Sequence, residues 1–184
     1  MSRSEPSHVR PERPEDYADV RRVLEAAFPT PAEAQLVERV RAAATDRVAW
    51  VAERAGSVIG QVLLTPVTIG SGDRAARGMG LGPVSVDPAH QRRGVGGALI
   101  EAGLAACRAR GDRLVVVLGH PSYYPRFGFE PAWPHGLYYG TPGENPAFMV
   151  RGLVDGALEG LAGEVRYVDA FSSEAVSGGV GSSG

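Results

Sequence analysis

Two amphipathic helices are predicted near the start of the chain. After Pro14, which suits the first turn of a helix, apolar side chains recur at spacings of three and four residues: Tyr17, Val20, Leu24, Ala27 and Phe28. A second helix begins near Thr30 and Glu33, which have the form of a capping box. Its apolar face carries Leu36, Val37, Val40, Ala43 and Ala44. We expect each helix to bury one face against the rest of the protein.

The pattern then changes to that of strands. Residues 48–54 and 58–69 are rich in Val, Ile and Thr and flank a turn at residues 55–57, so they predict an antiparallel hairpin. After an Arg- and Gly-rich link, residues 81–86 predict another strand. Because this strand contains Gly82 and Pro83, we expect it to be irregular, bulged or open along one edge.

A strand, helix and strand unit is predicted over residues 81–118. The helix, residues 94–110, carries few charges, so most of its surface should pack on a sheet. The apolar run at residues 114–118 is typical of a central parallel strand that a crossover helix reaches. Farther along, residues 122–127 predict a single helical turn, and residues 129–133 and 147–151 predict short strands.

These elements fit one α/β domain. A chain of 184 residues that is 43% hydrophobic is long enough for a single core of this class and short for two. We assign residues 1–171 to this domain. The Gly- and Ser-rich residues 172–184 have little to bury, so we predict a disordered tail there.

Charge and hydropathy exclude several classes of partner. The formal net charge of −2 gives no positive field for nucleic acid, so we expect no nucleic-acid partner. The longest aliphatic run, residues 114–118, is far too short to span a bilayer, and the start of the chain has no apolar signal-peptide segment. We therefore expect a cytoplasmic protein that has no membrane partner.

Residue counts narrow the chemistry further. The single cysteine, Cys107, excludes an intrachain disulfide, and with the scattered histidines it argues against a metal site. All 19 basic residues are Arg. The absence of Lys excludes phosphate loops and covalent mechanisms that need this residue.

The segment at residues 91–97 carries the most specific signal. Its sequence, Gln-Arg-Arg-Gly-Val-Gly-Gly, lies between a strand and the start of a helix, where glycines let backbone N–H groups converge on an anion. A diphosphate would fit such a loop. A dinucleotide fingerprint fails, because Leu99 stands where the third glycine should be. The alternative is a glycine-rich turn that only packs the helix on the sheet.

In this context the sequence resembles the GNAT superfamily of N-acetyltransferases. The family shares Gln-x-x-Gly-x-Gly after a strand, and here that strand ends in Val-Ser-Val-Asp-Pro at residues 84–88. Residues 123–129, Tyr-Tyr-Pro-Arg-Phe-Gly-Phe, resemble the Phe-Tyr-Glu-Lys-x-Gly-Phe segment of these enzymes. The resemblance covers residues 8 to 132.

This resemblance implies a fold and a cosubstrate. The fold would be a single GNAT-like domain with a mixed, mostly antiparallel sheet of six or seven strands. Its centre would be a parallel pair, residues 81–86 and 114–118, with helices on both faces. Acetyl-CoA would be the cosubstrate, and its binding residues would be Val84, Ser85, Val86, Gln91, Arg92, Arg93, Gly94, Val95, Gly96 and Gly97.

The resemblance also implies a reaction. A primary amine of a small-molecule or peptide acceptor would attack acetyl-CoA directly in a ternary complex, and Tyr124 would be the acid that protonates the leaving sulfur. Tyr124 could instead be an aromatic packing residue, and we expect Tyr123 to be one. Glu53, His120 or a chain of water molecules could each act as base. Covalent transfer through Cys107 is disfavoured, because an apolar helix face suppresses its thiolate.

Several features leave alternatives open. Gly-His-Pro-Ser at residues 119–122 replaces an Asn-x-x-Ala segment that many relatives carry, and Pro125 replaces a Glu. Arg13 stands where Ser or Thr would cap the first helix, which we expect to cost about 0.5–2 kcal/mol. The alternative functions are a non-catalytic acyl-CoA-binding or regulatory domain, or a glycine-rich fold without CoA.

The acceptor itself is not identified by the sequence. In this family it would lie near residues 28–40 and 134–146, where Tyr138 and Tyr139 could form an aromatic wall or an oligomer contact. Dimers are common among relatives, so a homodimer is one candidate assembly.

Overall fold

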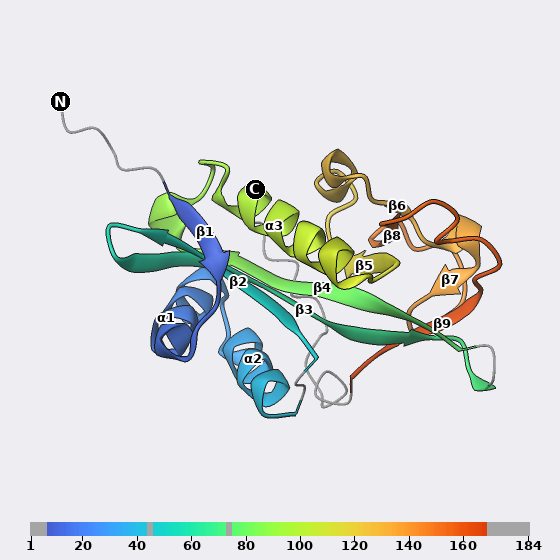
Figure 1. Cartoon of the computed structure of the whole chain (residues 1–184), viewed down its shortest axis with the longest axis horizontal. Helices are drawn as coiled ribbons and strands as arrows, with labels where there is room; N and C mark the ends of the chain where they lie inside the picture. Colours follow the sequence, from blue (N-terminus) through green and yellow to red (C-terminus); the bar gives the residue numbers. More distant parts are fainter. Residues whose placement is uncertain (1–6, 44–45, 73–74, 169–184) are drawn as a thin grey trace.

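The computed structural model describes residues 7–43, 46–72 and 75–168, so the predicted tail at residues 172–184 lies outside it. A mixed sheet forms the centre, with α3 on one face and α1 and α2 on the other (Figure 1). The main strand order is β1-β2-β3-β4-β5-β8-β6, and β9 and β7 extend the edge of β3. The helices are α1 (Tyr17–Ala27), α2 (Ala32–Ala43) and α3 (Val95–Arg110), and the strands are β1 (His8–Pro11), β2 (Val48–Arg54), β3 (Ser57–Ile69), β4 (Ala76–Val86), β5 (Leu114–Leu118), β6 (Glu130–Pro131), β7 (Leu137–Tyr138), β8 (Phe148–Gly152) and β9 (Gly163–Tyr167).

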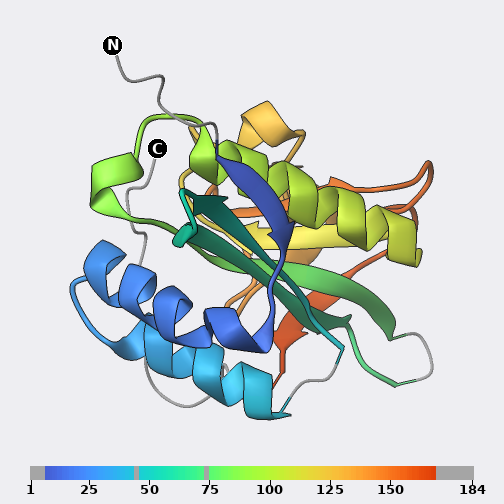
Figure 2. The same cartoon turned by 60° about the vertical axis from the view of Figure 1, so that its left-hand side comes forward.

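The two N-terminal helices bury the faces that their apolar spacing predicted. Figure 2 shows α1 and α2 side by side against the sheet. Buried side chains of α1, among them Val20 and Leu24, share a cluster with Val37 and Val40 of α2 and with strands β2 and β3. The predicted apolar face of α2 extends one turn too far, because Ala43 is exposed where the helix ends. Ala44 lies outside the described residues.

The crossover helix α3 packs on the opposite face of the sheet. Leu99, Ile100 and Leu104 are buried there in a cluster that includes residues of strands β2 to β5. Gly103 allows the close approach, because a Cβ atom at this position would lie 2.7 Å from Leu64 Cδ1. No helix in the described ranges is long and apolar enough to cross a membrane.

Strand β4 is longer than the sequence predicted. Its first five residues, which were interpreted as a link, pair with β3 from Ala76↔Ile69 onward. The prediction failed because Gly78 and Gly80 have no side chains that reveal a strand pattern. Neighbouring side chains cover these glycines instead, and a Cβ at Gly80 would lie only 2.3 Å from the Tyr167 ring.

The parallel pair at the centre of the sheet is confirmed, as is the class of fold. Strand β8 lies within one residue of its predicted bounds, and β6 falls inside the predicted short strand. Strands β7 and β9 were not predicted. They pair with each other, and β9 also pairs with β3 at residues 67–69, where β2 no longer accompanies it. This part of the sheet is covered by its own buried cluster, which includes Leu137, Phe148 and Val165.

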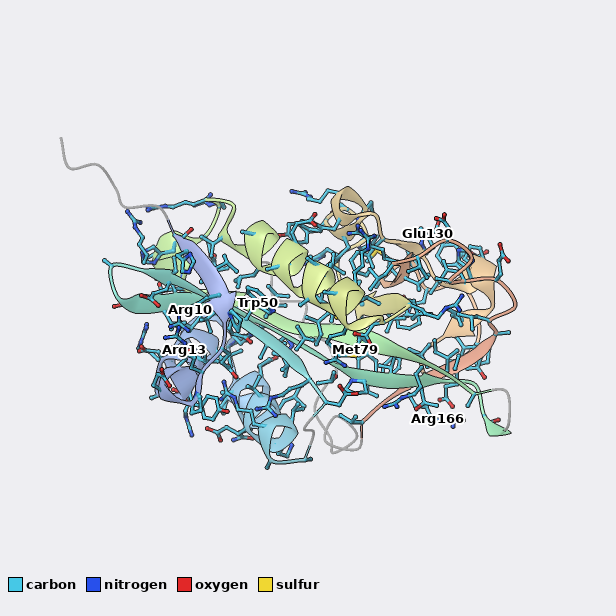
Figure 3. The ribbon with its side chains drawn as sticks, viewed as in Figure 1. Arg10, Arg13, Trp50, Met79, Glu130 and Arg166 are labelled. Atoms are coloured by element: carbon cyan, nitrogen blue, oxygen red, sulfur yellow. The ribbon has the colours of Figure 1, made fainter. Side chains whose placement is uncertain are left out.

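A buried ion network fixes the start of the fold. Arg10 and Arg13 lie where β1 leads toward α1 (Figure 3). Arg10 donates to both carboxylate oxygens of Asp16, at 2.7 and 2.8 Å, and its Nε donates to Glu53 at 2.8 Å. The Arg13 backbone N–H donates to Asp16 Oδ2 at 2.7 Å. The missing Ser or Thr cap is therefore replaced in part by Asp16, which satisfies one N–H at the helix start.

This network predicts a pH-dependent contribution to stability. The Arg10 guanidinium, with help from the Arg13 N–H, holds the pKa of Asp16 below its usual value. A depressed carboxyl pKa stabilises the fold above the unfolded value near 4, and this contribution is lost as the pH falls through the folded pKa. We expect Asp16→Asn to lower the free energy of unfolding by about 3 kcal/mol at pH 7.

Urea unfolding of Asp16→Asn and the wild type at a series of pH values measures this effect. The difference between the two proteins should shrink only in acid, where Asp16 becomes protonated. A difference that stays the same down to the lowest pH would contradict this role of the carboxylate.

Candidate active site

A gap between two central strands is the first feature of the site. Strands β4 and β5 pair over only three positions, and the last of these is Leu81↔Val117. Strand β4 continues to Val86, whereas β5 ends at Leu118. Residues 84–86 therefore pair with β3 on one side only, and Gly82 and Pro83 have no regular partner on either strand. The irregular strand predicted from Gly82 and Pro83 is confirmed, since the register with β3 shifts between Val62 and Leu64.

The open side of β4 presents backbone groups of two valines. Asp87 donates its N–H to Ile59 O of β3 at 2.8 Å. Because consecutive residues of a strand direct their backbone groups to alternate sides, Ser85 faces β3 and Val84 and Val86 face the gap. The Gln91 side chain supports this orientation, since its Nε2 donates to Val86 O at 3.1 Å. The N–H and C=O of Val84 and the N–H of Val86 remain directed into the gap.

The glycine-rich loop lies beside this gap and leads into α3. Arg92 and Gly94 both have left-handed backbone conformations, with φ of 57° and 80°. The first intrahelical bond of α3 runs from Ala98 N–H to Gly94 O at 3.0 Å. The N–H groups of Val95, Gly96 and Gly97 precede that bond, so they have no partner within the helix. Together with the helix dipole they form an anion-binding surface.

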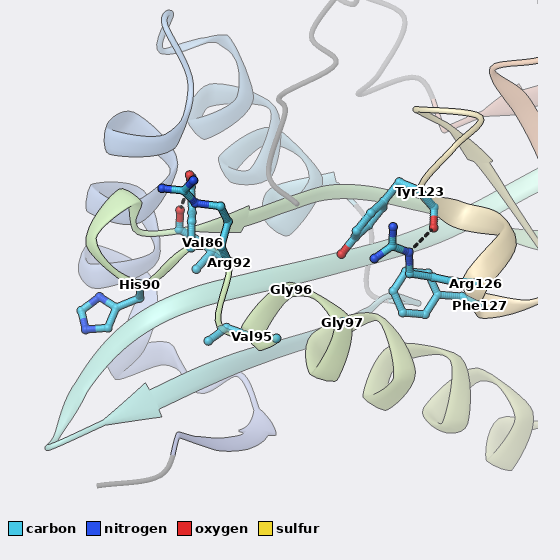
Figure 4. Close-up of a pocket in the computed structure, with 11 residues that line it drawn as sticks. Val86, His90, Arg92, Val95, Gly96, Gly97, Tyr123, Arg126 and Phe127 are labelled. Atoms are coloured by element: carbon cyan, nitrogen blue, oxygen red, sulfur yellow. Dashed lines mark hydrogen bonds between the residues drawn. The ribbon is translucent and has the colours of Figure 1, made fainter. Parts of the chain in front are cut away.

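A pocket of about 320 Å³ opens over this loop (Figure 4). Seven of the ten residues predicted to bind the cofactor line it: Val86, Gln91, Arg92, Gly94, Val95, Gly96 and Gly97. The other three lie elsewhere. Val84 lies farther along the gap, the Ser85 side chain is buried against Gln61 of β3, and Arg93 is exposed outside the pocket lining.

Four further residues complete the lining: His90, Tyr123, Arg126 and Phe127. Arg126 stacks on Tyr123, with its Cζ 4.5 Å from the ring centroid, and its Nε donates to Tyr123 O at 3.0 Å (Figure 4). Tyr123 therefore packs as the sequence suggested, and it also forms a wall of the pocket. Tyr123, Arg126 and Phe127 belong to the 123–129 motif, but nothing in that pattern alone indicates which of its side chains face a ligand.

Tyr124 follows β5 by six residues and begins the single helical turn η4 (Tyr124–Phe127). Its ring makes an edge contact with Phe129, with centroids 5.7 Å apart, and it covers Gly119 so closely that a Cβ there would lie 2.2 Å from the ring. Glycine at position 119, one of the departures from the family pattern, is thus required by Tyr124. Burial raises the pKa of Tyr124 to about 12, so the phenol stays protonated at neutral pH.

The other candidate chemical groups have different environments. Glu53 is held by Arg10 in the N-terminal network, and His120 is exposed. Cys107 is fully buried on the face of α3 that packs on the sheet, and burial raises the pKa of its thiol to about 12. Such a thiol is almost entirely protonated at neutral pH and has no access to a substrate. Among the residues that the structure describes, no three His, Cys, Asp or Glu side chains gather as a metal site would require.

This combination of a parted strand pair and a glycine-rich helix start matches a known family. A family model described as an acetyltransferase (GNAT) domain matches residues 8–132. The chain belongs to the GNAT acetyltransferase family. The interval agrees with the extent of the resemblance in the sequence.

Relatives of similar length support this assignment. The chain is 36% identical over 165 residues to the N-acetyltransferase YhbS of Escherichia coli K12, covering 89% of this chain and 98% of the relative. A crystal structure of Escherichia coli YhbS in complex with CoA superposes with a TM-score of 0.85 at 33% identity, covering 95% of this chain and 98% of the other. A GNAT acetyltransferase from Brucella melitensis in complex with acetyl-CoA gives a TM-score of 0.74 at 37% identity, covering 90% and 98%.

Proposed function

We propose that this GNAT protein transfers an acetyl group from acetyl-CoA to a primary amine by direct attack in a ternary complex. The observation that carries the proposal is the gap between β4 and β5, which opens next to the free N–H groups of the α3 N-terminus. One extended ligand with a diphosphate at one end and amides along its arm fits both features. The relatives described as complexes with CoA and acetyl-CoA support this choice.

The cofactor arm would be held mainly by backbone groups. The diphosphate would accept hydrogen bonds from the N–H groups of Val95, Gly96 and Gly97. The pantetheine amides would pair with the Val84 C=O and the Val86 N–H as an added strand does at an open sheet edge, which leaves the Val84 N–H for the thioester. Arg92 and Arg126, which face the pocket from the loop and from η4, would add positive charge near the phosphates.

The reaction would form one C–N bond and then break one C–S bond. The amine nitrogen forms a bond to the thioester carbonyl carbon, and the carbonyl oxygen gains negative charge that the Val84 N–H stabilises. Collapse of this intermediate breaks the C–S bond and releases the CoA thiolate. The amide product loses one proton from nitrogen, and the thiolate gains one to form the free thiol.

Tyr124 is proposed as the donor to that sulfur. A phenol with a pKa of about 12 is a weaker acid than a thiol, whose pKa is about 8.5. The phenol would therefore act first as a hydrogen-bond donor to the developing thiolate. The thiolate then gains its proton to become the free thiol, while the product nitrogen loses one proton, so the two transfers balance.

The acceptor is proposed to be a small-molecule or peptide amine that approaches near residues 134–146. In this region the Tyr139 ring lies against Tyr167, with centroids 5.4 Å apart at an angle of 82°. Tyr167 in turn covers Gly80 on the face of the sheet opposite α3. An aromatic surface of this kind favours an acceptor with an apolar body next to its amine.

The backbone character of the phosphate site predicts an order of effects on acetyl-CoA affinity. Gly96→Val adds a branched side chain to the pocket lining, which would displace the diphosphate from the backbone N–H groups, and should weaken binding by roughly tenfold or more because charged hydrogen bonds are lost. Arg92→Ala removes one exposed charge and should cost about fivefold or less. Isothermal titration with acetyl-CoA measures both. Affinity that survives Gly96→Val but collapses with Arg92→Ala would contradict a backbone-based site.

The role of Tyr124 predicts a loss of turnover without a loss of binding. Tyr124→Phe keeps the ring packing and removes the donor, so kcat should fall by roughly 100-fold or more while acetyl-CoA affinity is retained. With the pKa of Tyr124 near 12, its deprotonation should not lower kcat between pH 7 and 10. The assay is CoA thiol release with a panel of amines.

Tyr17→Phe is the matched control and should leave turnover unchanged, because the Tyr17 ring of α1 lies against Arg41 of α2 and does not line the pocket. If acetyl-CoA binds but no amine yields free CoA, the transferase proposal fails and a non-catalytic acyl-CoA-binding domain takes its place. If turnover occurs and Tyr124→Phe matches the wild type, Tyr124 is a packing residue only.

A further inference from the structure

A buried glutamine lies directly behind the open part of β4. Gln61 of β3 has an exposed fraction of 2%, on the face of the sheet opposite α3. Its Nε2 donates to Pro83 O at 3.1 Å and to Ser85 Oγ at 3.2 Å. No other side chain among the described residues hydrogen-bonds to this segment of β4 from β3. The sequence gives no sign of this role, because Gln61 occupies an ordinary position in the predicted hairpin.

The bulge explains why Pro83 needs this donor. Val62 pairs with Val84 and Leu64 pairs with Leu81, so Leu63 alone stands opposite both Gly82 and Pro83. One of the carbonyls of the bulge then lacks a regular ladder partner. A buried carbonyl without a donor costs about 1–3 kcal/mol, and the Gln61 amide supplies the missing hydrogen bond.

The same hydrogen bond determines where the next N–H points. The peptide bond between Pro83 and Val84 is trans, so its C=O and N–H point in opposite directions. Gln61 draws the Pro83 carbonyl toward β3. The Val84 N–H, on the other side of that rigid plane, is therefore directed into the gap between β4 and β5.

We propose that Gln61 is a positioning residue that holds the Val84 N–H at the angle needed to polarise the acetyl-CoA thioester. The inference rests on the proposed function, because the orientation of the Val84 N–H matters only if this group binds the thioester oxygen. Gln61 does not touch the cofactor. It acts through the Pro83–Val84 peptide plane, and Ser85 Oγ, which accepts a second hydrogen bond from the same Nε2, helps to hold the Gln61 amide in place.

The direct measurement is the carbonyl stretch of bound acetyl-CoA labelled with ¹³C at the thioester carbon, recorded by infrared difference spectroscopy. This readout needs no acceptor amine. Binding to the wild type should shift the stretch to lower frequency than in free acetyl-CoA, because a well-aligned donor polarises the bond. Gln61→Met, which keeps the volume but removes the donor, should lose most of that shift while acetyl-CoA affinity stays close to wild type.

A matched control comes from the same strand. Leu63 lies two residues from Gln61 on the same buried face. Leu63→Met introduces the same residue as Gln61→Met but removes no hydrogen bond. It should keep the full shift. Gln61→Asn, whose amide is one methylene too short to reach Pro83, is the second variant if Gln61→Met folds poorly. With an amine that supports turnover, Gln61→Met should lower kcat by roughly 10-fold to 100-fold and leave KM for acetyl-CoA nearly unchanged.

The outcomes separate this inference from the proposed function. If the wild type does not bind acetyl-CoA, the proposed function fails. If the wild type binds it and shows the shift, but folded Gln61→Met or Gln61→Asn shows the same shift, Gln61 has no positioning role and the proposed function stands. If Leu63→Met loses the shift equally, the effect reflects core packing and the inference is overturned.

Discussion

The feature on which the rest of this structure depends is the early end of pairing between β4 and β5. A sheet normally satisfies every backbone N–H and C=O along its central strands, and groups left unpaired inside a protein are costly. Here β4 continues for five residues beyond its last partner on β5. Proline at position 83 removes one donor outright, Gln91 occupies the carbonyl of Val86, and Gln61 occupies that of Pro83. The groups still free include those of Val84 and Val86, which is where an amide-bearing ligand could pair.

The elements around the gap between β4 and β5 hold its two sides in fixed positions. On one face, α3 packs so closely on β3 that a Cβ at Gly103 would lie 2.7 Å from Leu64 Cδ1, and Val95 in the first turn shares a buried cluster with Val86 of β4. On the other face, α1 and α2 support β3 at Leu63, and Arg10 ties the edge strand to both α1 and β2. The helix N-terminus and the open strand edge are thereby held as parts of one continuous surface. The binding groups belong to the backbone of these rigid elements, whereas the candidate acid Tyr124 lies on a short turn packed against Gly119.

Much of this arrangement could be predicted from the sequence where local chemistry determines structure. The two amphipathic helices, the apolar strand at residues 114–118 and the glycine-rich loop before α3 each carry a pattern with one physical meaning. Gly82 and Pro83 correctly predicted an irregular strand. The first half of β4 was missed because glycines at 78 and 80 carry no pattern, and the side chains of Leu114 and Tyr167 that cover them come from later in the chain. The role of Gln61 was missed for a similar reason, since it depends on a bulge in a different strand. Likewise, the motif at residues 123–129 was recognised, but which of its side chains line the pocket depends on how η4 packs on α3.

The measurement that tests this account most directly is a crystal structure of the chain with acetyl-CoA. The account predicts that the pantetheine arm lies between β4 and β5, with its amides hydrogen-bonded to the backbone of Val84 and Val86 and its diphosphate on the N–H groups of residues 95–97. A structure in which β4 and β5 pair along residues 82–86, or in which acetyl-CoA binds elsewhere on the molecule, would contradict it.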